Sequence, residues 1–431
     1  MEDPLADLIP FKGLIYSDSF RNSMEQVTTP PYDIISKEAQ KAFYDRHPDN
    51  VIRLELPIPP ATETPENNRY TNAKKDLDRM IHSGALRVDD APSLYCYSMT
   101  FRDPLSGFDR TIRGFVGRIR LEEWEKKIVY PHERTLQGPK EDRMALFKAT
   151  GCSFSQIYCL YPDKDKEIMA LLGKQSKERF RCKDGDNVMH ELGSVRDKAT
   201  IDAVVSAFSK KSLFIADGHH RYETYLAYRN YRRSLEASPD PQASYEFVTV
   251  FLAALEDENL SVLPTHRLVR NLTPKGGEEF LVALGARGEI SRFPASSSAE
   301  FLKALRNSPK EAVVIGVAVR DRDELLLCRL NVQKSEGVKS LDTYWLQEGV
   351  LSPLLGITPE RIKTEDLLRY DKSENSVIEK VLKSKEYPLA FFIRPVSPKV
   401  IEEVSLRGEL MPQKSTYFYP KPLTGMVMAT L

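Results

Sequence analysis

The side chains best suited to chemistry form the run Asp217-Gly218-His219-His220-Arg221, between a short apolar segment and a stretch with helical spacing. Gly218 permits a sharp turn, and Asp217 is a candidate cap for the helix that follows. The first turn of a helix presents amides without intrahelical partners and the positive end of the helix dipole. The run therefore predicts an anion site, in which Arg221 and His219 or His220 donate to phosphate oxygens.

Two other interpretations of this run stay open. An Asp-Gly pair before a helix is common as simple capping, and one of two adjacent histidines usually points into a core. His219 and Glu223 are four residues apart and could hold a metal ion on one helix face, but the sequence offers no third ligand nearby. We therefore expect no metal ligands in this chain.

A second polar run covers residues 130–143, where charged side chains stand beside two prolines and a glycine. This composition does not give a packing face, so the run is either a solvated loop or part of a site. In a site, Glu133 is a candidate general base, and Lys140 or Arg143 is a candidate phosphate ligand.

A third run, residues 411–421, is rich in lysine, hydroxyl and aromatic side chains. It is either an edge strand that docks through its aromatic residues or a cleft wall. As a cleft wall it would supply Lys414 and the hydroxyls of Ser415 and Thr416.

The composition limits the class of protein. Lys+Arg and Asp+Glu both number 62 in 431 residues, and this zero net charge argues against a nucleic-acid partner. The five cysteines are dispersed, which is typical of reduced thiols. The first residues are acidic and have no apolar signal-peptide core, and the apolar stretches are far shorter than the ~20 residues of a membrane span. We therefore expect a cytoplasmic protein without membrane contact.

The elements that must position these runs follow from periodicity and turn residues. Residues 180–196 are polar and turn-rich, whereas residues 273–335 alternate helices and strands as a small α+β unit. The predicted domains are a core over 1–270, an inserted α+β subdomain over 271–340, and a C-terminal segment over 341–431 that completes the site. We expect helices over 36–47, 67–83, 163–179, 197–208, 219–233, 277–284, 298–306 and 342–351, and strands over 93–102, 110–121, 155–161, 211–216, 246–255, 311–319, 324–331 and 387–394.

In this combination and order, the motifs resemble the domain-of-unknown-function family 1015. The strings that carry the resemblance are long and run nearly end to end. They are Pro10-Phe11-Lys12-Gly13, Pro30-Pro31-Tyr32-Asp33-Ile34-Ile35-Ser36, 132–140, 215–229, Leu263-Pro264-Thr265-His266-Arg267 and 411–421.

The resemblance implies a fold and an activity. The Asp-Gly-His-His-Arg turn is similar to the nucleotide-phosphate turn of the ParB/sulfiredoxin superfamily, which includes free-serine kinases. The implied fold is mixed α/β (α+β), with a ParB/sulfiredoxin-like nucleotide-binding core, the inserted unit and a C-terminal segment that returns to the core. The implied reaction transfers phosphate from ATP or ADP, with Mg²⁺, to free L-serine, or runs in reverse on phosphoserine.

The resemblance also implies roles for the three runs. Which carboxylate takes the serine proton, that of Glu133, Asp217 or Asp33, stays open. The implied catalytic residues are Glu133, Asp217 and His220; the nucleotide-binding residues are Gly218, His219, His220, Arg221 and Lys140; the substrate-binding residues are Arg134, Thr135, Lys414, Ser415 and Thr416.

A second hypothesis of a different class is a ParB-like regulatory switch that binds and slowly hydrolyses a nucleotide and has a macromolecular partner. The zero net charge counts against DNA as that partner. Sulfinic-acid reduction is a third hypothesis, and the absence of a cysteine from the Asp217–Arg221 run argues against it.

Overall fold

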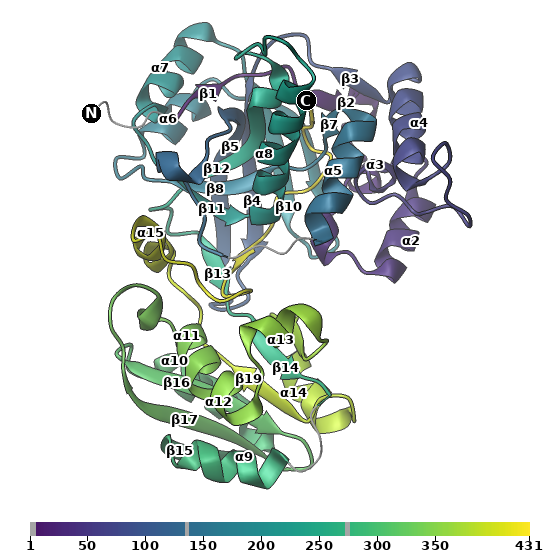
Figure 1. The fold of residues 1–431 in the computed structure, drawn as a ribbon. Helices are drawn as coiled ribbons and strands as arrows, with labels where there is room; N and C mark the ends of the chain where they lie inside the picture. Colours follow the sequence, from purple (N-terminus) through teal and green to yellow (C-terminus); the bar gives the residue numbers. More distant parts are fainter. Residues whose placement is uncertain (1–5, 134–137, 272–275) are drawn as a thin grey trace. The chain divides into compact units, whose positions relative to one another are not determined.

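The computed structural model describes residues 6–133, 138–271 and 276–431 (Figure 1). The chain is a mixed α/β protein that divides into two compact units. Unit 1 comprises residues 1–131, 135–261 and 420–431, and unit 2 comprises residues 132–134 and 262–419.

Unit 1 is built on a nine-stranded mixed sheet. The strand that ends at Asp217, β11 (Leu213–Asp217), lies second from one edge of the sheet. It is parallel to the edge strand and antiparallel to the neighbour on its other side. Its apolar residues are buried on both faces, as its composition predicts. Along the sheet the strands are β6 (Val129–Tyr130), β11 (Leu213–Asp217), β8 (Ile157–Tyr161), β12 (Phe247–Ala254), β5 (Asp109–Arg120), β4 (Leu94–Arg102), β10 (Met189–Val195) and β9 (Lys177–Lys183), with β1 (Leu8–Ile9) paired to β5.

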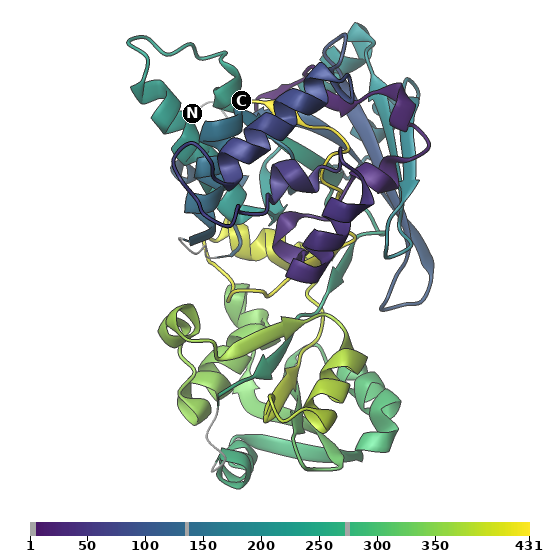
Figure 2. The same cartoon turned by 90° about the vertical axis from the view of Figure 1, so that its right-hand side faces the viewer.

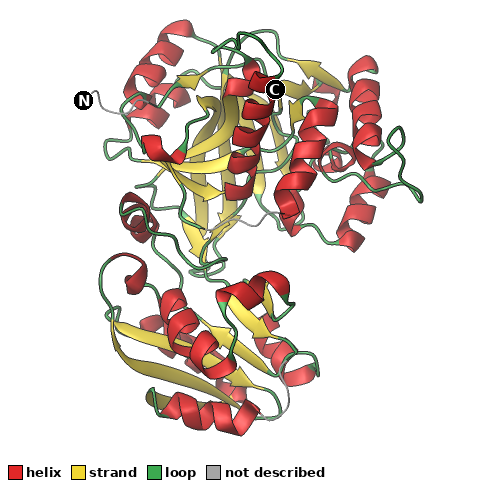
Figure 3. Cartoon of the chain, viewed as in Figure 1, coloured by secondary structure: helices red, strands yellow, loops and turns green. Residues whose placement is uncertain are grey.

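Helices pack against this sheet (Figure 3). Several of them begin at a residue whose side chain caps the first turn. The Ser36 side chain accepts from the Ala39 amide at 3.2 Å, and Asn68 forms a capping box with Thr71. The N-terminal helices gather on one side of the unit (Figure 1, Figure 2). The helices are α1 (Met24–Val27), α2 (Lys37–Arg46), α3 (Ile52–Glu55), α4 (Arg69–His82), α5 (Gly138–Thr150), α6 (Glu167–Gly173), α7 (Lys198–Phe208) and α8 (His219–Ser234).

Unit 2 is built on a six-stranded antiparallel sheet. The third strand of this sheet, β16 (Ala312–Val319), is buried on both faces, because its alternate residues belong to two different apolar clusters. Val313, Ile315 and Val317 belong to one cluster, and Val314 and Ala318 belong to the other. The strands are, in order, β15 (Gly288–Pro294), β17 (Glu324–Gln333), β16 (Ala312–Val319), β19 (Leu389–Phe392), β14 (His266–Val269) and β18 (Leu368–Asp371).

Helices complete unit 2, and short strand pairs complete the chain. The helices are α9 (Gly276–Gly285), α10 (Ser298–Asn307), α11 (Asp342–Leu346), the π-helix η7 (Gln347–Leu351), α12 (Ser352–Leu355), α13 (Pro359–Thr364), α14 (Glu374–Lys383) and α15 (Pro398–Leu406). The short pairs are β2 (Leu14–Tyr16) with β3 (Leu86–Val88), β7 (Cys152–Ser153) with β21 (Ala429–Thr430), and β13 (Ser261–Leu263) with β20 (Tyr417–Tyr419).

Most predicted elements are present, but the prediction over residues 163–196 is wrong in two places. The helix predicted over 163–179 is confined to α6, and the segment 180–196 is not a turn-rich loop. Instead β9 and β10 form an antiparallel hairpin at the edge of the sheet. Polar residues at buried positions of β9 and β10 interrupt the alternation of apolar and polar residues by which a strand is predicted. His190, for example, is buried and bonds to Tyr97 and Asp184.

The unit boundaries differ from the predicted ones. Residues 271–340 supply only part of the unit 2 sheet, because β16 pairs with β19 and β19 pairs with β14. Strand pairing between distant segments therefore joins them into one unit over 262–419. The last residues, 420–431, belong to unit 1, where β21 pairs with β7. In the described part of the chain, every helix is too short or too polar to cross a membrane.

Candidate functional site

The junction between β11 and α8 has the strand–glycine–helix geometry that the sequence predicts. Gly218 is the N-cap and is left-handed, with φ +99° and ψ 28°. A side chain here would be strained, and its Cβ would lie 3.0 Å from the Arg221 guanidinium. The helix opens with the bond from the Tyr222 amide to the Gly218 carbonyl at 2.9 Å. The backbone amides of the first turn therefore lie before the first hydrogen bond of the helix, so they have no carbonyl partner within the helix itself.

Asp217 does not cap this helix, contrary to the prediction. It is the last residue of β11, so Gly218 holds the capping position and no side-chain cap bond forms. The Asp217 carboxylate instead accepts from two cations. Arg221 Nη2 lies 2.7 Å from one oxygen, and Lys421 Nζ bonds to the other. The turn therefore carries an acid held between two positive charges.

Arg221 is buried, and its guanidinium is held by protein acceptors. Nη1 donates to the Ser155 hydroxyl at 3.2 Å and to the Gln156 carbonyl at 2.7 Å. Burial lowers the pKa of Arg221, but the nearby carboxylates, Asp217 first and Asp33 next, outweigh it and raise the pKa overall. Arg221 is thus a permanently charged group that fixes the position of Asp217. A direct contact of Arg221 with phosphate stays a prediction.

Two lysines reach the turn from other segments of unit 1. The Lys421 side chain is only 6% exposed, and it pairs with Asp217. Lys140 on α5 forms an ion pair with Glu223, which lies one helical turn after His219. Since Glu223 is paired with Lys140, a metal ion would have to compete with that lysine. Within the described residues, no three His, Cys, Asp or Glu side chains form a metal-binding group.

A buried charged network adjoins Arg221. Glu55 accepts from the Ser155 hydroxyl at 2.9 Å and lies 3.5 Å from Arg143 Nη1. Arg143, 2% exposed, also donates to Asp142 at 2.6 Å. Burial raises the pKa of Glu55, and Arg143 and then Arg221 oppose that shift. The sequence prediction missed Glu55 and Ser155 because neither stands in a run of polar residues.

The carboxylate of Asp33 also belongs to unit 1. It is exposed and lies close enough to Arg221 to affect the pKa of that guanidinium. Two of the three candidate bases, Asp33 and Asp217, are thus in the unit that contains the Gly218 turn.

The third candidate base, Glu133, belongs to unit 2 and contacts the predicted substrate-binding residues there. Its Oε1 accepts from the Ser415 amide at 3.1 Å and from the Thr416 hydroxyl at 3.4 Å. His132 Nε2 lies 2.9 Å from that hydroxyl. Lys414 has a left-handed backbone, with φ +56°. Arg134 and Thr135 lie outside the described residues.

The family assignment follows from the sequence match. The family model DUF1015, described as "protein of unknown function", matches residues 8–344. The chain belongs to the DUF1015 family. No curated protein matches this DUF1015 chain.

Three solved structures resemble the DUF1015 chain at low similarity. A conserved hypothetical protein from Pyrococcus furiosus is 13% identical, with a TM-score of 0.36, over 73% of this chain and 94% of that one. A free serine kinase in complex with AMP is 12% identical, with a TM-score of 0.37, over 70% and 86%. C-terminally truncated SbnI from Staphylococcus aureus is 11% identical, with a TM-score of 0.33, over 72% and 86%. A likeness this distant carries no conclusion about activity.

The chemistry open to this DUF1015 protein follows from its own residues. The Gly218 turn combines the start of a 16-residue helix with two ammonium groups, each of which forms an ion pair with a carboxylate. A polyanion can compete with a carboxylate for an ammonium group, because its several oxygens and higher charge give stronger charge-assisted hydrogen bonds. The turn is therefore suited to a phosphate group.

Proposed function

We propose that this DUF1015 protein is a nucleotide-dependent phosphotransferase that acts on free L-serine. The observation that carries the proposal is the junction of β11 and α8, where Gly218 turns the chain and Arg221 and Lys421 converge on Asp217. Phosphoryl transfer needs positioning and charge neutralisation more than covalent catalysis, and a helix start with fixed cations supplies both.

The nucleotide phosphates would bind the amides after Gly218. Lys421 and Lys140 would move from Asp217 and Glu223 to phosphate oxygens, while Arg221 stays on Ser155 and Gln156 and fixes the turn. Mg²⁺ would arrive with the nucleotide, because this ion binds phosphates and water with only one or two carboxylates.

In the proposed reaction the serine hydroxyl oxygen attacks the terminal phosphorus of ATP or ADP. The P–O bond to the leaving nucleotide breaks, and a carboxylate takes the hydroxyl proton, which gives O-phosphoserine with ADP or AMP. Asp217 becomes available as that base when Lys421 shifts to phosphate, and Asp33 is already exposed. Glu133 is the third candidate, and Lys414, Ser415 and Thr416 remain the proposed serine-binding residues.

The test is an assay of purified protein with Mg-ATP or Mg-ADP and a panel of free amino acids, with products identified by mass spectrometry. We expect phosphoserine as the product. Lys421→Met should reduce the rate strongly, whereas Lys198→Met, which removes an exposed lysine of α7, should leave it unchanged. Among Asp33→Asn, Asp217→Asn and Glu133→Gln, the variant that lacks the base should lose roughly 10²- to 10⁴-fold in turnover.

The same assay, together with a measurement of nucleotide binding, can reject the proposal. Absence of phosphotransfer to every amino acid, with tight nucleotide binding, would instead support a ParB-like switch. Absence of both transfer and nucleotide binding would remove the phosphate role of the Gly218 turn altogether.

A further inference from the structure

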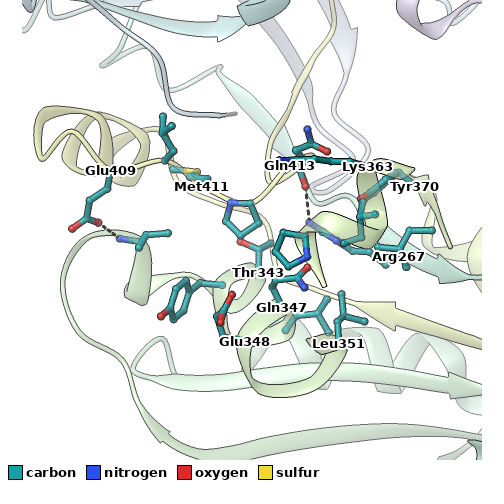
Figure 4. Close-up of a pocket in the computed structure, with 18 of the residues that line it drawn as sticks. Arg267, Thr343, Gln347, Glu348, Leu351, Lys363, Tyr370, Glu409, Met411 and Gln413 are labelled. Carbon is teal, nitrogen blue, oxygen red and sulfur yellow. Dashed lines mark hydrogen bonds between the residues drawn. The ribbon is translucent and has the colours of Figure 1, made fainter. Parts of the chain in front are cut away.

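Unit 2 contains a cavity of about 460 Å³ that shares no residue with the Gly218 turn (Figure 4). Its walls come from the helical segment 343–351, from α13, from β14 and β18, and from residues 408–413. Most of the lining is apolar, with Leu346, Leu351, Ile362, Leu368 and Met411 as the main side chains. A cavity of this size and character is typical of a small-molecule site, in which a few polar groups orient an apolar ligand.

Arg267 supplies a buried positive charge to this cavity. The residue is 3% exposed, and its guanidinium donates to the carbonyls of Thr265, Gln413 and Lys414, the last two at 3.3 and 3.2 Å (Figure 4). Carbonyls satisfy hydrogen bonds but do not neutralise a charge. Burial lowers the pKa of Arg267, against the smaller influence of Tyr370 and Glu133. A buried cation without an ion pair is costly, and a bound anion would remove that cost.

The acids near Arg267 form no ion pair with it in the described part of the chain. Glu133 lies close enough to raise the pKa of Arg267, although its Oε1 accepts hydrogen bonds from the Ser415 amide and the Thr416 hydroxyl. Glu409 accepts from the Val338 amide at 2.6 Å, and Glu348 is exposed at the rim.

The backbone of the cavity wall is also irregular. A continuous helix is predicted over 342–351, but the structure has a π-helix at Gln347–Leu351, where the Ser352 amide bonds to the Gln347 carbonyl. Gln347, Glu348 and Leu351 of this segment face the cavity (Figure 4). A π-helical turn is rare in an α-helix and is found frequently at functional sites. This feature is consistent with a functional role for the cavity wall and does not depend on the charge of Arg267.

We propose that this cavity binds a small organic carboxylate with an apolar body, whose carboxylate faces Arg267. Arginine is suited to this role, because its five N–H donors outnumber the three carbonyls that Arg267 holds, so the guanidinium can also donate to a carboxylate oxygen. Exposed Lys363, which also lines the cavity, adds positive charge at the rim. The apolar part of the lining favours a ligand with a larger apolar body than serine has. The proposal does not rest on the phosphotransferase assignment.

The test uses octanoate as the probe and octanamide as its neutral counterpart, with the full-length protein and no nucleotide. Binding is measured by isothermal titration calorimetry. We expect octanoate to bind, and octanamide to bind roughly 10- to 100-fold more weakly, since a charge-assisted bond is lost. Ile362→Trp should abolish binding by filling the cavity, whereas Val282→Trp, at an exposed position of α9, should not change it.

Arg267→Met should weaken octanoate binding to the level of octanamide in the native protein. If that variant does not fold, the comparison of octanoate with octanamide and the Ile362→Trp result still decide. Equal affinity for the two probes would overturn the role of Arg267. Absence of octanoate binding, or binding that persists in Ile362→Trp, would overturn the site itself.

Discussion

His266 on β14 predicts a pH dependence of the stability of unit 2. Its ring is fully buried, and Nδ1 accepts from the Ile393 amide at 3.4 Å, so the proton of the neutral ring is on Nε2. Among the described residues, Nε2 has no hydrogen-bond partner. Burial lowers the pKa of His266 to about 3, and the adjacent Arg267 adds to that effect, against Asp371. The folded protein therefore holds a neutral imidazole through the mildly acidic range.

The sign and size of the effect follow from proton linkage. Below about pH 6.5 the unfolded chain binds a proton at this histidine, whereas the folded chain does not until the pH approaches 3. Each pH unit in this window lowers the free energy of unfolding by about 1.4 kcal/mol. At about pH 5 the loss relative to neutral pH is ~2 kcal/mol. His266→Phe removes the titration and keeps an aromatic ring beside Phe392, whose centroid lies 5.2 Å away.

The assay is urea unfolding of both proteins at about pH 7.5 and about pH 5. The chain has two tryptophans, Trp124 in unit 1 and Trp345 in unit 2, so a Trp124→Phe background lets Trp345 fluorescence report on unit 2 alone. Other titrating groups affect both proteins equally, and the difference isolates His266. We expect the parent to lose ~2 kcal/mol more than His266→Phe on acidification. Equal losses would refute the reasoning, because His266 would then titrate alike in both states.

Two further predictions concern unit 1. Arg143→Met should lower the free energy of unfolding by about 3–5 kcal/mol, because it leaves buried Glu55 without its nearest cation. The double variant with Glu55→Gln should recover part of this loss, as measured by urea unfolding followed by Trp124 fluorescence. Gly218→Ala should cost about 1–2 kcal/mol for its positive φ, plus the crowding of Arg221. Gly151→Ala, also at positive φ but with no atom within 4 Å of the added Cβ, is the matched control, and equal losses would show that crowding is unimportant.

The parts of the site that the sequence could predict are those with local causes. The turn at Gly218 follows from an apolar strand, a glycine and a helical repeat within about twenty residues. The starts of α2 and α7 likewise follow from Ser36 and Asp197, whose side chains accept from amides of the first turn. In each case the stabilising partner lies a few residues away, so the spacing alone identifies it.

The parts that it could not predict depend on partners distant in the chain. Lys421 lies 204 residues from Asp217, and Ser155 lies 100 residues from Glu55. Nothing in the spacing of these residues selects one partner over another, because the β-sheet pairing that brings them together is non-local. The hairpin of β9 and β10 is not predictable for a related reason. Its buried polar residues have hydrogen-bond partners on other segments, so composition alone indicates a polar, turn-rich segment.

The partners also change which cation is suited to bind an anion. By residue type, Arg221 is the natural phosphate ligand of the turn, but its donors hold Ser155, Gln156 and Asp217. Moving the Arg221 guanidinium to a ligand would break several buried hydrogen bonds at once, and each buried group left without a partner would cost free energy. Lys421 would give up its bond to the Asp217 carboxylate, and that carboxylate keeps its bond to Arg221. Anion binding at this turn should therefore depend more on the lysine for direct contact, while the arginine keeps Asp217 in place.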